Sequence, residues 1–399
     1  MSTPPICLTH YTATTCLGPG KAPLRAALAE RRSGLAPCTF ETVQLDTWVG
    51  AVEGVDEVTL PAHLAAYNCR NNRLALLGLE SDGFGDAVRT AIARHGKRRI
   101  GLFLATSTSG ILETEIAYRH RAPQTGALPA DYHYRETHNS YSVAAFVRDY
   151  FGLEGPAAVI STACSSSAKV FASAQRMLAC GLIDAAVVGG VDSLCLTTLY
   201  GFNSLELLSD QPCRPYDTER KGISIGEAAA FALLERDNTA NPDAQVWLLG
   251  CGESSDAYHM SAPHPEGRGA RGAMEAALAQ AGLAADAVDY INLHGTATPS
   301  NDAAEGQAVM SLFGQRAPCS STKGATGHTL GAAGGVEAVI AALAIEDGLM
   351  PGSCNTQQLD PAIAIDYVLE PRRAPLRRVL SNSFGFGGSN CSLLLGVRP

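Results

Sequence analysis

The chain has 399 residues, of which 46% are hydrophobic and 17% charged, so it can bury a large core as two domains or as one fused α/β unit. Its net charge of −9 argues against general binding to nucleic acid or to anionic membranes, which requires a basic face. The twelve cysteines form no Cys-x-x-Cys pair. The opening MSTPPICLTHYTATT lacks the basic start and long apolar run expected of a signal peptide, and the sequence has no apolar run of about 20 residues. We therefore expect free thiols, no metal, no membrane insertion and a cytoplasmic protein.

The first part of the chain alternates predicted strands and helices. Short apolar runs predict buried strands at 99–105, 157–162 and 185–191. Residues 165–182 have the composition of a helix that ends at a glycine. The polar stretch 235–244 is the best candidate for a boundary between two parts of the chain.

The second part repeats this style. The pattern predicts a strand at 288–293, helices at 302–313 and 331–348, and strands at 377–381 and 391–396 around a glycine-rich turn. The helix after Cys164 and the helix after His328 are both rich in small residues, and each follows an apolar strand and a serine-rich turn. A duplicated unit would produce this echo, but composition alone would also produce it, so the sequence leaves duplication open.

Cys164 is the candidate nucleophile. It lies where a predicted strand runs into a predicted helix, so its side chain should be at a helix N-terminus, where backbone N–H groups favour a thiolate. The structural alternative is a buried thiol, which fits most of the other cysteines.

Two histidines and a lysine lie in two further glycine-marked turns. His294 directly follows a predicted strand, at the end of the strand where α/β proteins bind ligands. Lys323 and His328 are separated by two glycines, which favours a loop that turns both side chains inward. The alternatives are an imidazole that bonds a nearby carbonyl and an ordinary surface turn.

The C-terminal glycine turn at 383–390 could direct backbone N–H groups towards an oxyanion, or could be a simple β-hairpin. Asp302 and Glu305 share one face at the start of a predicted helix. They could orient Lys323 or form hydrogen bonds to the loops, or could only favour the helix N-terminus. Each feature has a structural explanation by itself, but their joint occurrence in this order favours a catalytic site.

Taken together, these segments resemble the β-ketoacyl-[acyl-carrier-protein] synthases of the thiolase fold, the Cys-His-His condensing enzymes of type II fatty acid and polyketide synthesis. The resemblance extends over nearly the whole chain. It is carried by TACSSS at 162–167, GGVDS at 189–193, RPYDTERKGISIGEAAA at 214–230, HGTATPSND at 294–302, STKGATGHTLGAAGG at 321–335 and SNSFGFGGSN at 381–390. It implies a five-layered αβαβα fold of two fused halves, which we expect at 1–240 and 241–399.

The resemblance also implies roles for the site residues. Cys164 would carry the acyl group as a thioester, and His294 and His328 would bind the malonyl carbonyl and stabilise the enolate that forms on loss of CO₂. Lys323 would organise the histidines with Glu305, supported by Asp302. The backbone N–H groups of Cys164 and Phe386 would form the oxyanion hole, Phe386 would gate the acyl pocket, and Thr296 and Thr298 would contact phosphopantetheine.

The implied partners are an acyl carrier protein, whose phosphopantetheine carries the substrates in place of a cofactor, and a second subunit in a homodimer or in a heterodimer with a paralogue. Because carrier proteins are acidic, candidate docking residues are basic: Arg70, Arg73, Arg119 and Arg121. Lys169 stands where fatty-acid enzymes often carry histidine, and segments 106–111 and 131–142 differ from the housekeeping enzymes. These departures leave the acyl substrate open and slightly favour a specialised pathway, such as one of the aryl-polyene type.

Other functions fit less well. A non-catalytic subunit of the chain-length-factor type, which shapes the tunnel of an active paralogue, typically lacks the nucleophile that this chain keeps. A biosynthetic thiolase is expected to carry a second cysteine in the C-terminal glycine turn, where this chain has Phe386. A cysteine protease fits least, because nothing in this sequence resembles the segments that surround the catalytic Cys and His of such enzymes.

Overall fold

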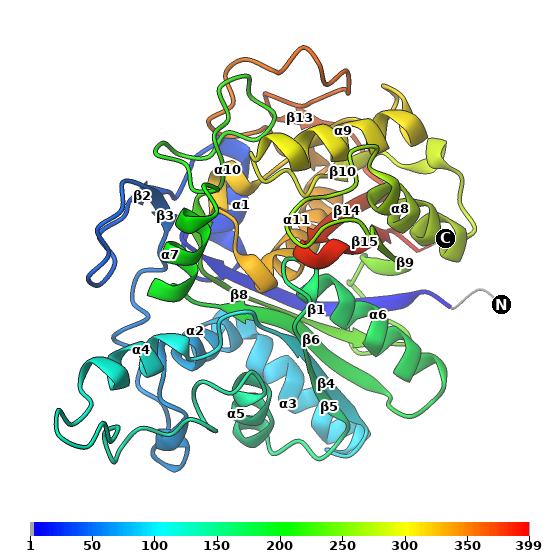
Figure 1. Cartoon of the computed structure of the whole chain (residues 1–399). Coiled ribbons are helices and arrows are strands. Elements are labelled where there is room, and N and C mark those ends of the chain that lie inside the picture. Colours follow the sequence, from blue (N-terminus) through cyan, green and yellow to red (C-terminus); the bar gives the residue numbers. More distant parts are fainter. Residues whose placement is uncertain (1–3, 399) are drawn as a thin grey trace.

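The computed structural model describes residues 4–398. They form one mixed sheet of ten strands with helices packed around it (Figure 1). The strands follow one another in space in the order β11-β10-β14-β15-β9-β1-β8-β6-β4-β5. Those before residue 240 are β1 (Ile6–Thr15), β4 (Ile100–Ala105), β5 (Ala157–Ile160), β6 (Ala185–Asp192) and β8 (Ala228–Glu235). Those after it are β9 (Trp247–Ser255), β10 (Tyr290–Asn292), β11 (Cys319–Ser320), β14 (Arg378–Gly385) and β15 (Ser389–Gly396).

The two sets of five strands have the same topology. In each set the third, second and fourth strands of the chain are parallel neighbours, and the fifth and first strands follow as antiparallel neighbours. The sets meet where β1 pairs with β9, with Ile6 opposite Leu248 and Cys7 opposite Trp247. This repeated strand order is the arrangement that a duplicated unit would produce.

Helices cover both outer faces and fill the space between the two halves. One outer cluster of buried side chains contains α2 (Arg70–Leu79), α3 (Phe84–His95) and α5 (Ser142–Phe151), packed on strands before residue 240. The other contains α8 (Arg268–Ala281) and α9 (Pro299–Phe313), packed on strands after it. The central cluster joins α6 (Ser166–Ala179) and α11 (Ala333–Asp347) to strands of both halves. The expected five-layered αβαβα fold is therefore confirmed.

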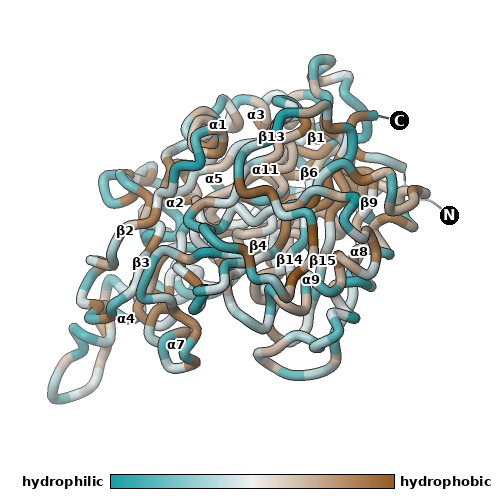
Figure 2. The backbone as a smooth tube through the Cα atoms, turned by 90° about the horizontal axis from the view of Figure 1, so that it is seen from above, coloured by the Kyte–Doolittle hydropathy of each residue, from teal (hydrophilic) through white to brown (hydrophobic). Residues whose placement is uncertain are grey.

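The middle layer depends on small residues. Thirteen residues of α11 are buried, Ala333 to Ile345 without interruption, because this helix lies between the two halves of the sheet. A Cβ atom at Gly334 would lie 2.6 Å from the backbone nitrogen of Ala168, so α6 and α11 approach too closely for a side chain there. In Figure 2, hydrophobic stretches of α11, β14 and β15 lie inside, while much of the outer loop backbone is hydrophilic.

The remaining elements surround these layers. They are α1 (Lys21–Glu30), α4 (Ile111–Arg119), α7 (Leu196–Ser204), the small sheet of β2 (Ala36–Pro37), β3 (Trp48–Gly50) and β7 (Ile225–Gly226), and the pair β12 (Leu349–Met350) and β13 (Arg372–Arg373). In residues 4–398 we find no helix with the length and apolar character that crossing a membrane requires.

The predicted elements are present, with shifted ends. The strand predicted at 288–293 is the shorter β10, and α9 begins at Pro299, before the predicted residue 302, because proline is favoured in the first helical turn. The polar stretch 235–244 begins with the last residue of β8 and continues in the connection to β9. The division of the chain into units 1–240 and 241–399 stays a prediction.

Candidate active site

The predicted nucleophile lies in the turn that joins β5 to α6. Ala163 has a positive φ of 53°, and α6 begins at Ser166, two residues after Cys164. This confirms the expected position of Cys164 at a helix N-terminus. Its side chain is buried, and the backbone N–H of Phe386 donates a hydrogen bond to its sulfur.

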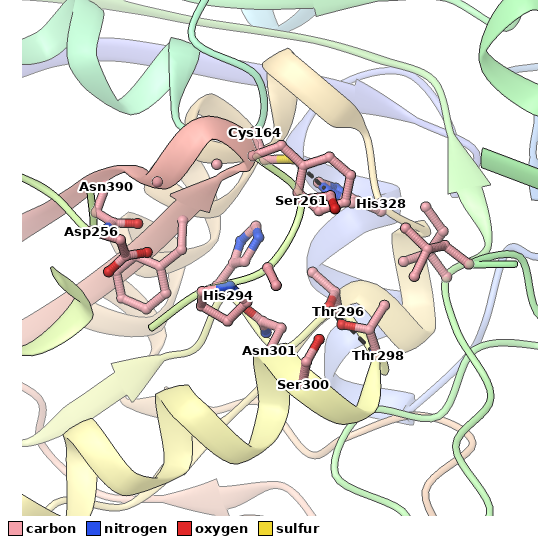
Figure 3. A pocket seen from close by; sticks show the side chains of 18 of the residues that line it. Cys164, Asp256, Ser261, His294, Thr296, Thr298, Ser300, Asn301, His328 and Asn390 are labelled. Atoms are coloured by element: carbon pink, nitrogen blue, oxygen red, sulfur yellow. Dashed lines mark hydrogen bonds between the residues drawn. The ribbon is translucent and has the colours of Figure 1, made fainter. Parts of the chain in front are cut away.

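Two imidazoles meet this sulfur. His328 Nε2 lies 3.0 Å from Cys164 Sγ, and the rings of His294 and His328 are 5.4 Å apart in an edge-to-face arrangement. One donor atom from each of the three residues lies within 4.8 Å of the other two (Figure 3). The structure therefore brings together the three residues that the sequence placed in separate turns.

Backbone geometry in each turn fixes the histidines. Gly295 has a φ of 35°, and a Cβ atom there would lie 2.5 Å from Ser321 Cβ, so only glycine fits after His294. His328 follows α10 (Lys323–Thr326), and its N–H donates to the Ser224 carbonyl at 2.8 Å.

Lys323 is buried beside His294, and its ion-pair partner is Glu337. Its ammonium donates to the His294 carbonyl at 2.5 Å, lies 3.4 Å from His294 Nδ1, and forms a short ion pair with Glu337. The ion-pair partner of Lys323 is thus Glu337, which the sequence alone does not identify. The signal that could have identified Glu337 is its place as the single charged residue among the first thirteen of α11.

Glu305 and Asp302 instead hold the turn that carries His294. Glu305 accepts hydrogen bonds from the backbone N–H groups of His294 and Gly295, both at 2.8 Å. Asp302 accepts from the Tyr216 N–H at 2.9 Å and the Ala297 N–H at 3.2 Å. Both carboxylates are buried, so they order the backbone and do not contact solvent or the cavity.

Burial dominates the electrostatics of the site. It lowers the pKa of His294 and of His328 well below the ordinary value of 6.5, and the nearby Lys323 ammonium lowers both further, so both rings are neutral near neutral pH. Burial raises the pKa of Cys164 to about 11, although Lys323 and the Phe386 N–H oppose the shift. Burial therefore favours the thiol, while Lys323 and the Phe386 N–H favour the thiolate, and the expectation of a partly formed thiolate stays a prediction. Burial also raises the pKa of Glu337 to about 7, against the effect of Lys323.

The three residues open onto a narrow cavity of about 50 Å³. Thr296 and Thr298 line it and share a hydrogen bond of 2.9 Å. Phe386 also lines it, and its ring packs on Phe202 at 5.9 Å between centroids. The sequence alone assigns no role to several polar residues of the lining. Asp256 and Ser261 come from the loop after β9, Ser300 and Asn301 from the first turn of α9, and Asn390 from the start of β15.

The predicted docking arginines differ in exposure. Arg70 is only 6% exposed, and its guanidinium donates to Glu227 at 2.6 and 2.9 Å. It cannot present a free charge on this surface, so its assignment to a docking patch is wrong. Arg73 pairs with Asp56, Arg119 pairs with Glu41, and Arg121 is exposed. Arg70 and Arg73 line a hollow separate from the Cys164 cavity.

Lys169 does not reach the cavity. It lies on α6 with a mostly buried side chain, and its ammonium is 3.6 Å from Glu253, which also pairs with Arg176. In this structure Lys169 joins α6 to β9.

Comparisons with known proteins agree with this site. Residues 79–240 match the family "Beta-ketoacyl synthase, N-terminal domain", and residues 246–357 match "Beta-ketoacyl synthase, C-terminal domain". A 3-oxoacyl-[acyl-carrier-protein] synthase 2 of Rhizobium meliloti is 42% identical over 258 residues, which cover 61% of each protein. A mitochondrial 3-oxoacyl-[acyl-carrier-protein] synthase of Arabidopsis thaliana is 38% identical over 262 residues, or 61% of this chain and 57% of that one. These alignments span about three fifths of the curated relatives' length.

Solved structures match over the full length. A ketosynthase in complex with its chain length factor from Xenorhabdus doucetiae matches with a TM-score of 0.89 and 39% identity, over 99% of this chain and 98% of that chain. The ishigamide ketosynthase/chain length factor matches with a TM-score of 0.90 and 25% identity over 100% of both chains. Sequence motifs, site geometry and these matches agree, and the chain belongs to the β-ketoacyl synthase family.

Proposed function

We propose that this protein is a ketosynthase that catalyses decarboxylative Claisen condensation in fatty acid or polyketide-type chain elongation. The observation that carries the proposal is the meeting of Cys164 Sγ, His328 Nε2 and His294 at one cavity. A thiol beside two neutral imidazoles suits chemistry that needs a nucleophile in one step and hydrogen-bond donors in the next.

The first half-reaction loads the enzyme. The Cys164 thiol loses its proton, and its sulfur attacks the carbonyl of an acyl thioester on acyl carrier protein. The bond between the acyl carbon and the carrier sulfur breaks, the carrier thiolate takes up the proton that Cys164 gave up, and the acyl group stays on Cys164. The backbone N–H of Phe386, which points at the sulfur, and that of Cys164 itself stabilise the oxyanion.

The second half-reaction forms the new bond. Malonyl-acyl carrier protein loses CO₂, and the electron pair of the broken carbon–carbon bond forms an enolate. His294 is suited to donate to the enolate oxygen, because the Lys323 ammonium on the Nδ1 side leaves the ring hydrogen on Nε2. The enolate carbon then attacks the acyl carbon of the Cys164 thioester, whose carbon–sulfur bond breaks. This releases 3-oxoacyl-acyl carrier protein, and the Cys164 thiolate takes up a proton from water and becomes a thiol again.

The proposal extends to the substrate carrier and to the location of the protein. Thr296 and Thr298, on the cavity wall, are suited to contact the phosphopantetheine of the carrier protein, and the reaction needs neither a metal nor a cofactor of the enzyme's own. A cytoplasmic location fits the twelve free thiols. The docking surface for the carrier protein stays a prediction for Arg73, Arg119 and Arg121.

A second subunit is supported by the edge of the sheet. β5 is the last strand in the sheet order, and all four of its residues, Ala157 to Ile160, are apolar and only half-buried. An apolar edge strand of this kind pairs readily with another chain. We infer a dimer at this edge, with a second copy or with a paralogue.

Intact-mass measurement tests the function. After exposure to a panel of acyl-acyl carrier protein thioesters, the wild-type chain should gain one acyl group, and Cys164→Ala should gain none. Cys164→Ala should also abolish condensation while still releasing CO₂ from malonyl-acyl carrier protein.

The same measurement separates the alternative. A non-catalytic subunit of the chain-length-factor type would gain no acyl group from any donor while it still binds a ketosynthase paralogue.

His328→Ala distinguishes the two half-reactions, because it should suppress decarboxylation of malonyl-acyl carrier protein more than self-acylation. Equal loss of both would contradict the roles given to the histidines.

A further inference from the structure

The three residues of the catalytic cavity are also a set of metal ligands. One thiol and two imidazoles offer donor atoms that all lie within 4.8 Å of one another, and all three side chains are buried. In tetrahedral zinc sites the sulfur and nitrogen donors are about 3.3–3.6 Å apart, given the usual bond lengths. His328 Nε2 and Cys164 Sγ are already 3.0 Å apart, so side-chain shifts of roughly 1 Å would bring all three to one ion.

We propose that Cys164, His294 and His328 form a binding site for a thiophilic divalent cation such as Zn²⁺, and that the bound ion blocks the nucleophile reversibly. The inference goes beyond the proposed condensation, which uses the free sulfur. It concerns an inhibitory ion and not a cofactor.

The ligand types decide which ion fits. Two imidazole nitrogens and one sulfur favour zinc and other soft or borderline cations, whereas Mg²⁺ and Ca²⁺ require oxygen ligands. The fourth position of a tetrahedral ion would face the cavity, which Thr296 and Thr298 line with hydroxyls and where a water can complete the coordination. This arrangement of three protein ligands and one open position differs from a closed structural zinc site.

The surroundings weaken the site without removing it. His328 Nδ1 has no hydrogen-bond partner among residues 4–398, and a missing partner of this kind lowers metal affinity by about 10–100-fold. The Lys323 ammonium, 3.4 Å from His294 Nδ1, opposes a second cation and keeps the ring hydrogen of His294 on Nε2. Coordination through Nε2 therefore requires this hydrogen to move to Nδ1 and the ammonium to turn towards Glu337, whose ion pair with Lys323 offsets much of its charge. We therefore expect exchangeable binding that a chelator reverses.

Protection of Cys164 from alkylation tests the inference without any assay of condensation. The full chain is treated with iodoacetamide with and without Zn²⁺, and the alkylation rate of Cys164 is followed by peptide mass. Zn²⁺ should slow alkylation at least about tenfold, and EDTA should restore the original rate. In His294→Ala and His328→Ala, the ratio of the two rates should fall towards one, because each variant lacks one ligand.

Matched controls remove a thiol and an imidazole elsewhere. Cys180→Ser and His120→Ala change exposed residues outside the cavity and should keep the full protection. The wild-type chain should also show a thiolate-to-metal charge-transfer band with Co²⁺, which Cys164→Ala should lack. This spectrum needs no histidine variant to fold.

Two results would overturn the inference. One is alkylation of wild-type Cys164 at the same rate with and without Zn²⁺. The other is a Co²⁺ band of equal intensity in the wild-type chain and in Cys164→Ala, which would assign the ion to other thiols. Neither result would affect the proposed condensation, which is measured by acyl transfer in the absence of metal.

Discussion

At the scale of single residues, the Lys323–Glu337 pair decides the state of the histidines. Both side chains are at least 97% buried, and the ammonium is held between Glu337, the His294 carbonyl and His294 Nδ1. A buried ion pair adds little net stability, but removal of one partner leaves an uncompensated charge in a medium of low dielectric constant. The pair therefore fixes the tautomer of His294, and its cost is that the site is sensitive to mutation of either partner.

Glu337→Gln should lower the free energy of unfolding by about 3 kcal/mol, because it leaves the Lys323 ammonium buried without a counter-charge. Thermal and denaturant unfolding of the purified chain measure this change. The double variant Lys323→Met/Glu337→Leu should recover most of the lost stability while condensation stays impaired. A Glu337→Gln variant as stable as wild type would contradict the charge balance described for this site.

The alkylation of Cys164 should depend on pH over a wide range. Burial raises the thiol pKa to about 11, so the reactive thiolate is a small fraction at neutral pH and grows about tenfold per pH unit. Rate constants for iodoacetamide at Cys164, measured by peptide mass between about pH 7 and pH 10, should therefore rise throughout. A plateau below about pH 8 would mean that the helix terminus and Lys323 outweigh burial.

At the scale of elements, α11 shows how side-chain size sets the middle layer. Its small residues allow contact with α6 on one side and with strands of both halves on others. Gly334 is the closest point, where a Cβ atom would meet the backbone nitrogen of Ala168, which is part of the helix after Cys164. The packing of these two helices thus fixes the distance between the turns of Cys164 and His328.

Gly334→Ala should destabilise the chain by about 1–3 kcal/mol, since backbone atoms cannot move aside as a flexible side chain would. Gly272→Ala in α8 is a matched control, because its Cβ would meet Ser254 Cβ at an ordinary 3.7 Å. The free energy of unfolding of this control should rise by about 0.5–1 kcal/mol, because alanine has a better helix propensity than glycine. If urea unfolding gave a change of the same sign in the free energy of unfolding of both variants, the packing described here would be wrong.

At the scale of the whole molecule, the two sets of five strands put the catalytic turns at one place. β5 leads to Cys164, while β10 leads to His294 and β11 leads into the turn of Lys323 and His328. Because β5 and β11 are the third strands of their sets, the turns after them occupy equivalent positions in the two halves. The repeated topology therefore brings a nucleophile from one half to the histidines of the other.

Assembly should depend on the open edge of β5. Ala158→Lys places a charge on this half-buried apolar strand and should shift the chain from dimer to monomer in light scattering, because an interface would bury that charge. Met310→Lys is the control, since Met310 is 41% exposed on α9, far along the sheet order from β5. If Ala158→Lys retained the wild-type mass, the dimer would not use this edge.

The sequence by itself singled out Cys164, His294, His328 and Lys323, which the structure brings together, and the alternating elements that carry them, because glycine-marked turns and apolar runs are local patterns. It also indicated the family through its motifs. It did not identify Glu337 as the partner of Lys323, nor the burial of Arg70 against Glu227, and it left the duplication open. These three features depend on contacts between different segments of the chain. The packing of the layers decides which charged side chains meet and which pKa values burial shifts.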